Sequence, residues 1–345
     1  MAFEFVPVHA SEQQELIRFL TRTLQDDLNL TSYRPDVVHW KYFTKHPEWS
    51  APRSLAVEQD GRIVAHGGVW PIQMLRAASE IRVIHLIDWA ATRAAVGAGV
   101  FLLRKMASWA DVMLTIGGSR DTRSLLPKLG YRQCGELRYY ARVIRPWLLF
   151  RTTPQRNWKT PLKLLRNSIR TVALPVAPPA GWQAIQISNF SNELDKIGRR
   201  PAWISSVRTA AGLNHLLSCP AASFSGFLVT LDQRPCGYFV LARVDGQTRI
   251  ADIRLNSDDP KSWVAVCALA ANVASDDSST CEIVAGASLP WIQDAWLTAG
   301  LIQRQSHPIW CYDPHNLIPV GLPLELNLAD GDHCFLSDPR RPYLS

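Results

Sequence analysis

The sequence predicts an α/β protein with an α+β mixed sheet, built from two tandem units. Some segments alternate apolar and polar residues, and others repeat apolar residues every three to four positions, so strands and helices are interspersed. The chain has 345 residues, a length that suits two domains of about 150 residues. The order of predicted elements in the first unit, 1–145, partly recurs in the second, 181–338, which indicates a duplication.

The first unit has the order β-α-α-β-β-β-α-β-α-β-β. Ser11 resembles a helix N-cap, and Asp60-Gly61 joins two β-rich runs as a hairpin. Gly130 is placed to end a helix that Pro127 bends or shortens. Strands are predicted at 4–8, 54–59, 62–70, 81–89, 112–116, 131–134 and 137–143, and helices after residue 11 and at 36–43, 100–107 and 121–129.

Residues 146–180 form a basic, proline-rich linker with one predicted helix at 161–171. Pro161 suits the first position of that helix, because the amide proton that proline lacks would be unpaired there. In the second unit strands are predicted at 182–187, 225–231, 236–245, 249–255, 282–285, 301–304 and 307–312, and helices at 193–197, 263–274 and 290–298.

The net charge of +7 is concentrated in one segment. No acidic residue stands between Glu136 and Glu193, whereas nine basic residues lie within 138–170. Subtracting these nine from +7 leaves −2 for the rest of the chain, so we predict no DNA partner. The linker is compatible with a solvated connector, a helix on a membrane surface or a nucleic-acid contact. We expect its apolar residues, in 147–150 and 158–169, to pack between the two units.

Several other classes of protein are excluded. No run approaches the ~18 apolar residues of a membrane-spanning helix. Residues 1–10 lack the basic and apolar regions of a secretory signal, so we expect a cytoplasmic protein. The seven cysteines are an odd number without a C-x-x-C pair. We expect them to be reduced, buried thiols, with neither a disulfide framework nor a metal site.

Short motifs of the first unit resemble the GNAT (GCN5-related N-acetyltransferase) superfamily. They are Ile87-Asp88-Trp89, the turn Val96-Gly97-Ala98-Gly99-Val100, the pair Gly117-Gly118, and Lys128-Leu129-Gly130-Tyr131. The run 40–43, the hairpin 60–66 and Asp330-Gly331-Asp332 look more narrowly like a bacterial group of tandem GNAT proteins. The resemblance covers nearly the whole chain.

The resemblance implies an acyl-CoA cofactor, most simply acetyl-CoA. In the family the CoA pyrophosphate binds backbone N–H groups that open a helix, where the helix dipole favours an anion and glycine allows close approach. The pantetheine arm lies between the fourth and fifth strands, here 84–89 and 114–117. The implied cofactor residues are Ile87, Trp89, Val96, Gly97, Ala98, Gly99, Val100, Phe101 and Arg104, with Lys105 also one turn along the helix.

Two positions depart from the family pattern. Ala94 stands where an arginine or glutamine usually precedes the glycines, and Leu126 stands where many members have the tyrosine that protonates the CoA thiolate. The candidate replacements for that tyrosine are Ser119, Tyr131 and Cys134. Each also has a structural interpretation: a helix N-cap, a core aromatic and a small buried side chain.

A general base must take the proton of the attacking amine. The candidates are Asp88 and His85 on the fourth strand and His66 on the third. Strand alternation places Asp88 and His85 on opposite faces, and we favour Asp88 because it is beside the glycine turn. Capping of nearby backbone amides by Asp88 and a structural role for His66 are the alternatives.

The second unit lacks the glycine turn and is expected to be degenerate. Two carboxylates, Asp258 and Asp259, stand where phosphates would bind, and like charges repel. Asp330-Gly331-Asp332 lacks further alternating ligands and is interpreted as a turn, with no metal.

The leading hypothesis is an acyl-CoA-dependent N-acyltransferase. Its acceptor would be a small-molecule amine, in a sugar or a polysaccharide precursor if the resemblance extends so far. One alternative is a Fem-type transferase, which takes its acyl group from aminoacyl-tRNA. The other is a non-catalytic binding or scaffold protein. The sequence does not fix the acyl length or the oligomeric state.

Overall fold

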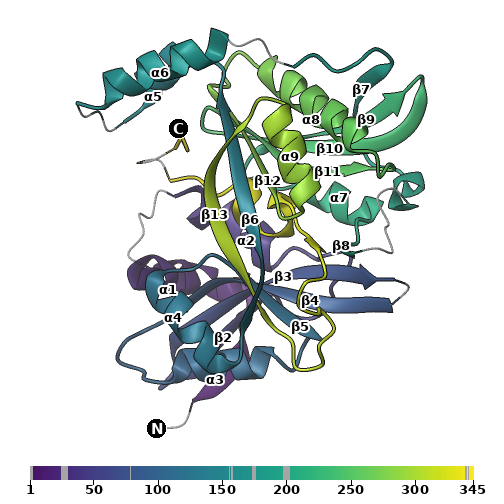
Figure 1. Cartoon of the computed structure of the whole chain (residues 1–345). Helices are drawn as coiled ribbons and strands as arrows, with labels where there is room; N and C mark the ends of the chain where they lie inside the picture. The colour runs from purple at the N-terminus through teal and green to yellow at the C-terminus, as the bar shows by residue number, and fades with distance from the viewer. Residues whose placement is uncertain are drawn as a thin grey trace.

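The computed structural model describes residues 3–24, 30–77, 79–154, 156, 158–172, 176–196, 203–338, 340 and 342–345. They form a long, curved mixed sheet flanked by helices (Figure 1). The strands are β1 (Glu4–Pro7), β2 (Ser54–Gln59), β3 (Arg62–Arg76), β4 (Ser79–Ala91), β5 (Val112–Ile116), β6 (Arg132–Val143), β7 (Trp182–Ile187), β8 (Ile204–Ser206), β9 (Ser223–Leu231), β10 (Arg234–Val244), β11 (Gln247–Leu255), β12 (Glu282–Ala287), β13 (Ile302–Tyr312) and β14 (Leu324–Glu325).

The α-helices are α1 (Gln13–Leu24), α2 (Pro35–Tyr42), α3 (Ala98–Met106), α4 (Arg120–Leu125), α5 (Pro146–Thr152), α6 (Thr160–Val172), α7 (Ala210–Leu217), α8 (Pro260–Ser275) and α9 (Pro290–Thr298). Short 3₁₀ helices are η1 (Ala10–Glu12), η2 (Thr31–Tyr33), η3 (Leu126–Leu129), η4 (Asn192–Lys196), η5 (Leu328–Asp330) and η6 (Asp332–Cys334). Among the described residues no helix is both long and apolar enough to cross a membrane.

The strand order joins the two halves of the chain into one sheet. From one edge it reads β1-β2-β3-β4-β5-β13, and from the other β7-β9-β10-β11-β12-β6. Each half therefore ends on the last long strand of the other half: β13 pairs with β5, and β6 pairs with β12. The two exchanged strands also pair with each other, antiparallel, in the middle of the sheet.

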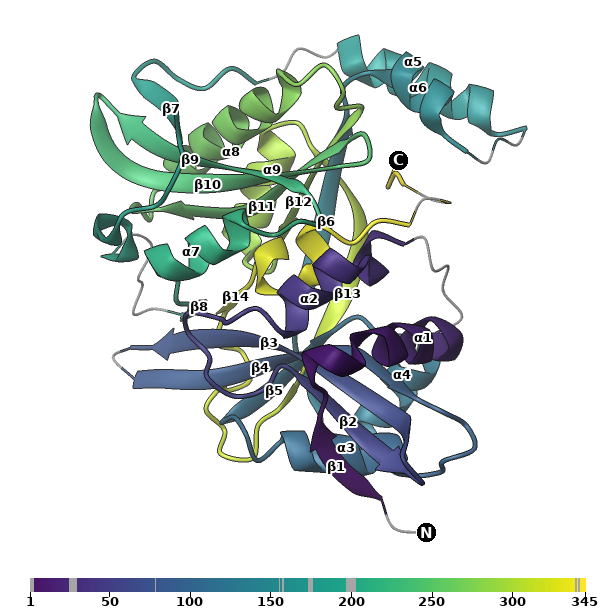
Figure 2. The ribbon, with the colours of Figure 1, turned by 180° about the vertical axis from the view of Figure 1, so that it is seen from behind.

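Helices cover the sheet of each half. In the first half α3 packs on one face through Leu102 and Met106, while α1 and α2 lie on the other face (Figure 2). In the second half α8 and α9 pack against β11 and β12. Gly67 shows how close α3 lies, because a Cβ there would approach the Met106 sulfur to 2.8 Å.

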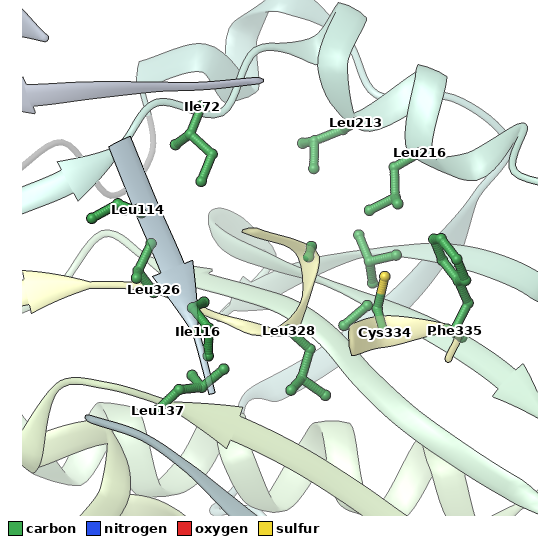
Figure 3. Packing of buried hydrophobic residues seen from close by; sticks show 14 of the residues in the cluster. Ile72, Leu114, Ile116, Leu137, Leu213, Leu216, Leu326, Leu328, Cys334 and Phe335 are labelled. Carbon is green, nitrogen blue, oxygen red and sulfur yellow. The ribbon is translucent and has the colours of Figure 1, made fainter. Parts of the chain in front are cut away.

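The largest apolar core lies between the two halves. It combines α2, the ends of β3 to β5, α7 and the C-terminal segment, which contributes Leu326, Leu328, Cys334 and Phe335 (Figure 3). This segment passes through the middle of the molecule, so residues 324–335 act as a shared core element.

Most predicted elements are confirmed, including 112–116, which matches β5, and the hairpin at Asp60-Gly61, where both residues have positive φ. Pro127 ends α4 early, and the last turn is the 3₁₀ helix η3, which stops at Gly130 with φ of +85°. The predicted break between 134 and 137 is wrong. Gly135 and Glu136 pair with β13, so β6 is continuous, and β13 likewise continues through 305–306.

The predicted linker contains two helices instead of one, because α5 precedes α6. Leu149 is buried, as expected from packing between units. The same prediction is wrong for Trp147, Trp158, Leu162, Leu165 and Ile169, which are all exposed. The cysteines are all free, and five of the seven are buried, as expected.

Candidate functional site

The glycine turn predicted to bind a cofactor opens α3. Gly97 is the N-cap residue, with φ of +89°, a conformation that only glycine adopts easily. Val96 beside it is 88% exposed. Gly99 lies against β4, where a Cβ would approach that of Ala91 to 3.1 Å, and its carbonyl accepts a hydrogen bond from the Trp89 indole at 3.3 Å. The turn thus combines tight packing with an exposed backbone.

The first turn of α3 has no side-chain cap, whereas that of α8 has one. Gly97 offers no side chain to the N–H groups that open α3. The carboxylate of Asp259 accepts bonds from the Lys261 and Ser262 amides of α8, at 3.3 and 2.9 Å. Unpaired amides at a helix N-terminus attract anions. The N-terminus of α3 is therefore available to an anion, whereas the Asp259 carboxylate already occupies the N-terminus of α8.

The strands β4 and β5 separate next to this turn. Within 79–116 they pair only from Val83 with Val112 to His85 with Leu114. On its other edge β5 pairs with β13 from Met113 to Ile116, and β4 bends at a bulge, where Asp88 and Trp89 together face Gly67. The fourth and fifth strands, β4 and β5, therefore separate after His85 and Leu114.

Asp88 occupies this bulge with φ of +47°, a strained conformation for a non-glycine residue. Its Oδ2 accepts hydrogen bonds from Lys41 Nζ at 2.6 Å and from the Tyr42 hydroxyl. Among the described residues, none bonds to Oδ1. The Asp88 side chain is 17% exposed, so this second oxygen is the part of the carboxylate that remains open to a ligand.

The expectation that Asp88 and His85 lie on opposite faces is wrong. Asp88 bonds to Lys41, which also pairs with Asp332 at 2.7 Å. His85 Nδ1 donates to the carbonyl of Asp330 at 2.8 Å. Both side chains therefore reach the 330–332 turn. The bulge at Asp88 adds a residue to β4 and reverses the alternation that a regular strand would have.

The 330–332 turn is built on buried ion pairs. Asp330 pairs with Arg208 at 2.8 Å, and Asp332 pairs with Lys41. Burial alone would lower the pKa of Lys41, but the charges of Asp332 and Asp88 outweigh it and raise that pKa above its usual value. Among the described residues no group of three or more acidic, histidine or cysteine side chains is placed to hold a metal ion.

His85 and His66 are buried, and burial lowers the pKa of each. His66 bonds through Nε2 to Ser54 Oγ at 2.9 Å and through Nδ1 to the carbonyl of Asp88 at 3.2 Å. Both of its nitrogens are thus occupied, in agreement with a structural role. Gly67 and Gly68 make room for α3 and Tyr42 rather than for a ligand.

A cavity of about 60 Å³ lies between the two halves. The first half lines it with His46, Glu48 and Arg53, and the second half with Thr209 and His215. The Thr209 hydroxyl donates to Glu48 Oε1. On a scale where one water needs roughly 10–15 Å³, this space admits a small polar group.

The cavity is lined by a buried arginine and by two histidine rings whose pKa values are lowered. Arg53 is 4% exposed, and its Nη2 bonds to two backbone carbonyls; among the described residues no carboxylate pairs with it. Burial lowers the pKa of His46 to about 3 and that of His215 to about 4, so both rings are neutral at pH 7. His215 stacks on Trp40 at 4.8 Å, and its Nε2 has no partner among the described residues.

This cavity adjoins the point where β4 and β5 separate. Asp330 lines it, and the carbonyl of Asp330 accepts the hydrogen bond of His85, the last residue of β4 that pairs with β5. None of the cavity residues Glu48, Arg53, Thr209 and His215 was predicted from the sequence, because they come from loops and a helix of both halves. Thr209 could have been noticed as a helix N-cap, because Leu213 and Leu216 follow it at helical spacing and so indicate α7.

Comparison with protein-family models and with curated protein sequences gives no match. Solved structures do match. A probable N-acyltransferase of unknown function from Enterococcus faecalis has a TM-score of 0.57 and 11% identity, over 90% of this chain and 72% of that one. A GCN5-related N-acetyltransferase from Anabaena variabilis has a TM-score of 0.58 and 12% identity, over 90% and 73%. Saccharomyces cerevisiae N-myristoyltransferase, solved with myristoyl-CoA, has a TM-score of 0.58 and 13% identity, over 90% and 82%.

The chain has the GNAT fold. In this GNAT-fold chain Ser119 and Tyr131 have the surroundings of their structural interpretations, whereas Cys134 is only partly buried and not the small buried side chain expected. Ser119 caps α4 through the Thr122 amide, at 3.1 Å. Tyr131 is buried, and burial raises its pKa. Cys134 Sγ donates to the carbonyl of Ile309 at 3.5 Å, and Leu126 is fully buried in the core beneath α3.

The other predicted cofactor residues divide between the surface and the core of the GNAT fold. Arg104 and the exposed Lys105 follow the turn, and Lys105 Nζ lies 5.6 Å from the centre of the Phe101 ring. Ala98 is buried, Val100 is half-buried, and Ile87 is buried against α1 and α2, on the face opposite α3. Any contact of Ile87 with a cofactor on the α3 side would therefore involve its backbone.

The Lys41→Met variant is expected to lose roughly 3–5 kcal/mol of unfolding free energy, because Asp88 and Asp332 would keep buried charges without a counterion. Urea unfolding at pH 7 measures the loss. Lys45→Met, at an exposed position nearby, is the control. A loss below about 1 kcal/mol in Lys41→Met would contradict the buried ion pairs.

Stability is expected to fall as the pH drops from about 7 toward 4. Burial lowers the pKa of His66 and His333 to about 4, whereas both titrate near 6.5 when unfolded. The unfolded chain binds these protons first, so each histidine adds a slope of up to about 1.4 kcal/mol per pH unit. Urea unfolding between pH 7.5 and 4.5 measures the slope.

The variant His66→Gln should flatten this curve, and His39→Gln, at an exposed position, should leave it unchanged. Equal stability of the original chain at pH 7 and pH 5 would contradict the role assigned to the buried neutral histidines.

Proposed function

We propose that this protein transfers an acyl group from acyl-CoA to an amine. The observation that carries the proposal is the uncapped glycine turn of α3, beside the separation of β4 from β5. The fold likeness to a probable N-acyltransferase and to an N-myristoyltransferase with bound myristoyl-CoA supports it. The acyl group would be acetyl in the simplest case.

Within the predicted range Val96 to Phe101, the amides of Ala98 and Phe101 already donate to the carbonyls of Ala95 and Gly97. The CoA pyrophosphate would therefore bind the remaining amides of the turn, where the helix dipole favours anions. Exposed Arg93, Arg104 and Lys105 would add positive charge. Ala94 provides no side-chain donor, so the backbone would supply most of the contacts. The pantetheine arm would enter between β4 and β5 and bring the thioester close to His85 and Asp88.

Acyl transfer needs a proton acceptor. The amine nitrogen attacks the thioester carbonyl, the carbon–sulfur bond breaks, and the amine loses one proton while the CoA thiolate gains one. We assign the acceptor role to Asp88, because its Oδ1 is open and Lys41 and Tyr42 fix its Oδ2. The buried Leu126 is unable to protonate the thiolate, so solvent would supply that proton.

The far end of the acceptor molecule would bind in the cavity between the halves, with its reacting amine directed toward Asp88, which does not line the cavity. Glu48 would accept hydrogen bonds from an ammonium group, and Arg53 would attract an anionic group on the same molecule. The space suits the end of a small amine. The lining gives no argument for the sugar or polysaccharide precursor that the resemblance suggested.

We further infer that residues 1–145 and 181–338 are duplicated GNAT-like units joined by 146–180. The mirrored strand order and the parallel pairs β4·β5 and β11·β12 support this. Because Asp259 occupies the amides that open α8, the second unit would bind no CoA. Its role would be to complete the cavity.

The Val96→Glu variant tests the cofactor position. Val96 is 88% exposed, so the substitution removes little packing but places a negative charge at the turn. The affinity for acetyl-CoA, measured by calorimetric titration, should fall about 10-fold or more, because a charged hydrogen bond contributes roughly 1.5–3 kcal/mol. Longer acyl-CoAs should respond in the same way.

The matched control is Val320→Glu, because Val320 is 79% exposed and lies outside the first half. It should bind acyl-CoA like the original chain. An original chain that binds no acyl-CoA would contradict the proposed enzyme and favour a scaffold protein. Equal binding by Val96→Glu would place the cofactor elsewhere.

The Glu48→Gln variant tests the acceptor cavity. CoA release is measured with a panel of small amines and amino acids as acceptors. The kcat/KM of Glu48→Gln should be about 10- to 100-fold lower than that of the original chain, because glutamine does not neutralise an ammonium group. Acetyl-CoA affinity should not change. Glu15→Gln, at an exposed position on α1, is the control. An unchanged kcat/KM in Glu48→Gln would contradict this acceptor site.

A further inference from the structure

The α5–α6 hairpin projects from the body of the protein (Figures 1 and 2). On α6 the polar residues face inward: Asn167 is 2% exposed and Thr160 is 9% exposed. The Thr171 hydroxyl donates to the carbonyl of Val143 in β6, at 3.2 Å. Polar contacts therefore attach the inner face of α6 to the body.

The outer face of α6 is apolar. Trp158, in the turn that leads into the helix, and Leu162, Leu165 and Ile169 follow at steps of four, three and four residues, so they form one stripe. They are 76%, 59%, 61% and 66% exposed. Trp147 of α5 is 62% exposed. Within the described residues no other element covers this stripe, which reverses the usual amphipathic orientation of a surface helix.

Basic residues accompany the stripe. At 100° per residue, Lys163, Arg166 and Arg170 all lie on one flank of it. Lys159 Nζ lies 5.2 Å from the centre of the Trp158 ring, and Arg156 lies 4.9 Å from that of Phe150 on α5. The hairpin contains no acidic residue, since none occurs in 137–192. Lys163 Nζ also donates to the Ser345 carbonyl at 3.2 Å. The surface of the hairpin therefore combines apolar side chains with positive charge.

We propose that the α5–α6 hairpin docks on the surface of an anionic membrane. The stripe would enter the boundary between headgroups and acyl chains, and the basic flank would face lipid phosphates. A second copy would bring the same positive charge and be repelled, and RNA would leave the aliphatic side chains uncovered. The 13 residues of α6 extend about 20 Å, so the helix would lie in the membrane plane.

The test measures sedimentation of the full chain with vesicles. One set contains phosphatidylcholine alone, and the other contains phosphatidylcholine with about 30% of the anionic lipid phosphatidylglycerol. Binding is expected to the anionic vesicles and to weaken with salt. The variant Leu162→Gln/Leu165→Gln/Ile169→Gln should bind at least ~10-fold more weakly. The affinity of the variant Lys163→Gln/Arg170→Gln should fall roughly 25-fold, at about 5-fold per charge.

The variant Leu297→Gln/Val320→Gln is the matched control, because it removes exposed apolar side chains outside the hairpin, and it should bind like the original chain. Thermal unfolding should show the same fold for every variant. Three results would overturn the proposal: no binding to anionic vesicles, stripe variants that bind as well as the original, or self-association that the stripe variant abolishes. Binding of tRNA that depends on the basic residues but not on the stripe, without vesicle binding, would also overturn it.

Discussion

The structure depends on the exchange of β6 and β13 between the two halves. Every strand inside a sheet needs partners for its backbone amides and carbonyls on both sides. β5 finds its outer partner in β13, and β12 finds its outer partner in β6. The halves are thus joined by backbone hydrogen bonds that neither can replace alone, and this fixes how α2, α7 and the C-terminal segment meet. The cavity between the halves follows from this geometry.

Buried ion pairs also join the two halves. Lys41 and Arg208 each come from a different half, and both pair with carboxylates of the 330–332 turn. Gly331 between those carboxylates lies against His85, where a Cβ would approach the ring to 2.6 Å. The 330–332 turn, which the sequence motif Asp330-Gly331-Asp332 indicated, is therefore buried and connects the two halves. It joins the bulge at Asp88, the end of the β4·β5 pairing and the lining of the cavity.

The sequence predicted elements whose causes are local. A short continuous apolar run indicated β5, Asp60-Gly61 indicated the hairpin, and Gly130 indicated the end of a helix. The continuity of β6 through Gly135 depends on β13, far away in the chain, so no local pattern reveals it. The common face of Asp88 and His85 depends on a bulge, and the residues of the cavity come from both halves. The uncapped α3 and the capped α8 were accessible to sequence analysis, because glycine and aspartate at an N-cap differ chemically.

The exchange also governs the order in which the protein is able to fold during its synthesis. β6 belongs to the first half, but its neighbours β12 and β13 span residues 282–312. While the ribosome makes the intervening residues, β5 and β6 both lack their final partners and present open strand edges, which favour pairing with other chains. The sheet of the first half is completed only after β13, residues 302–312, has been made.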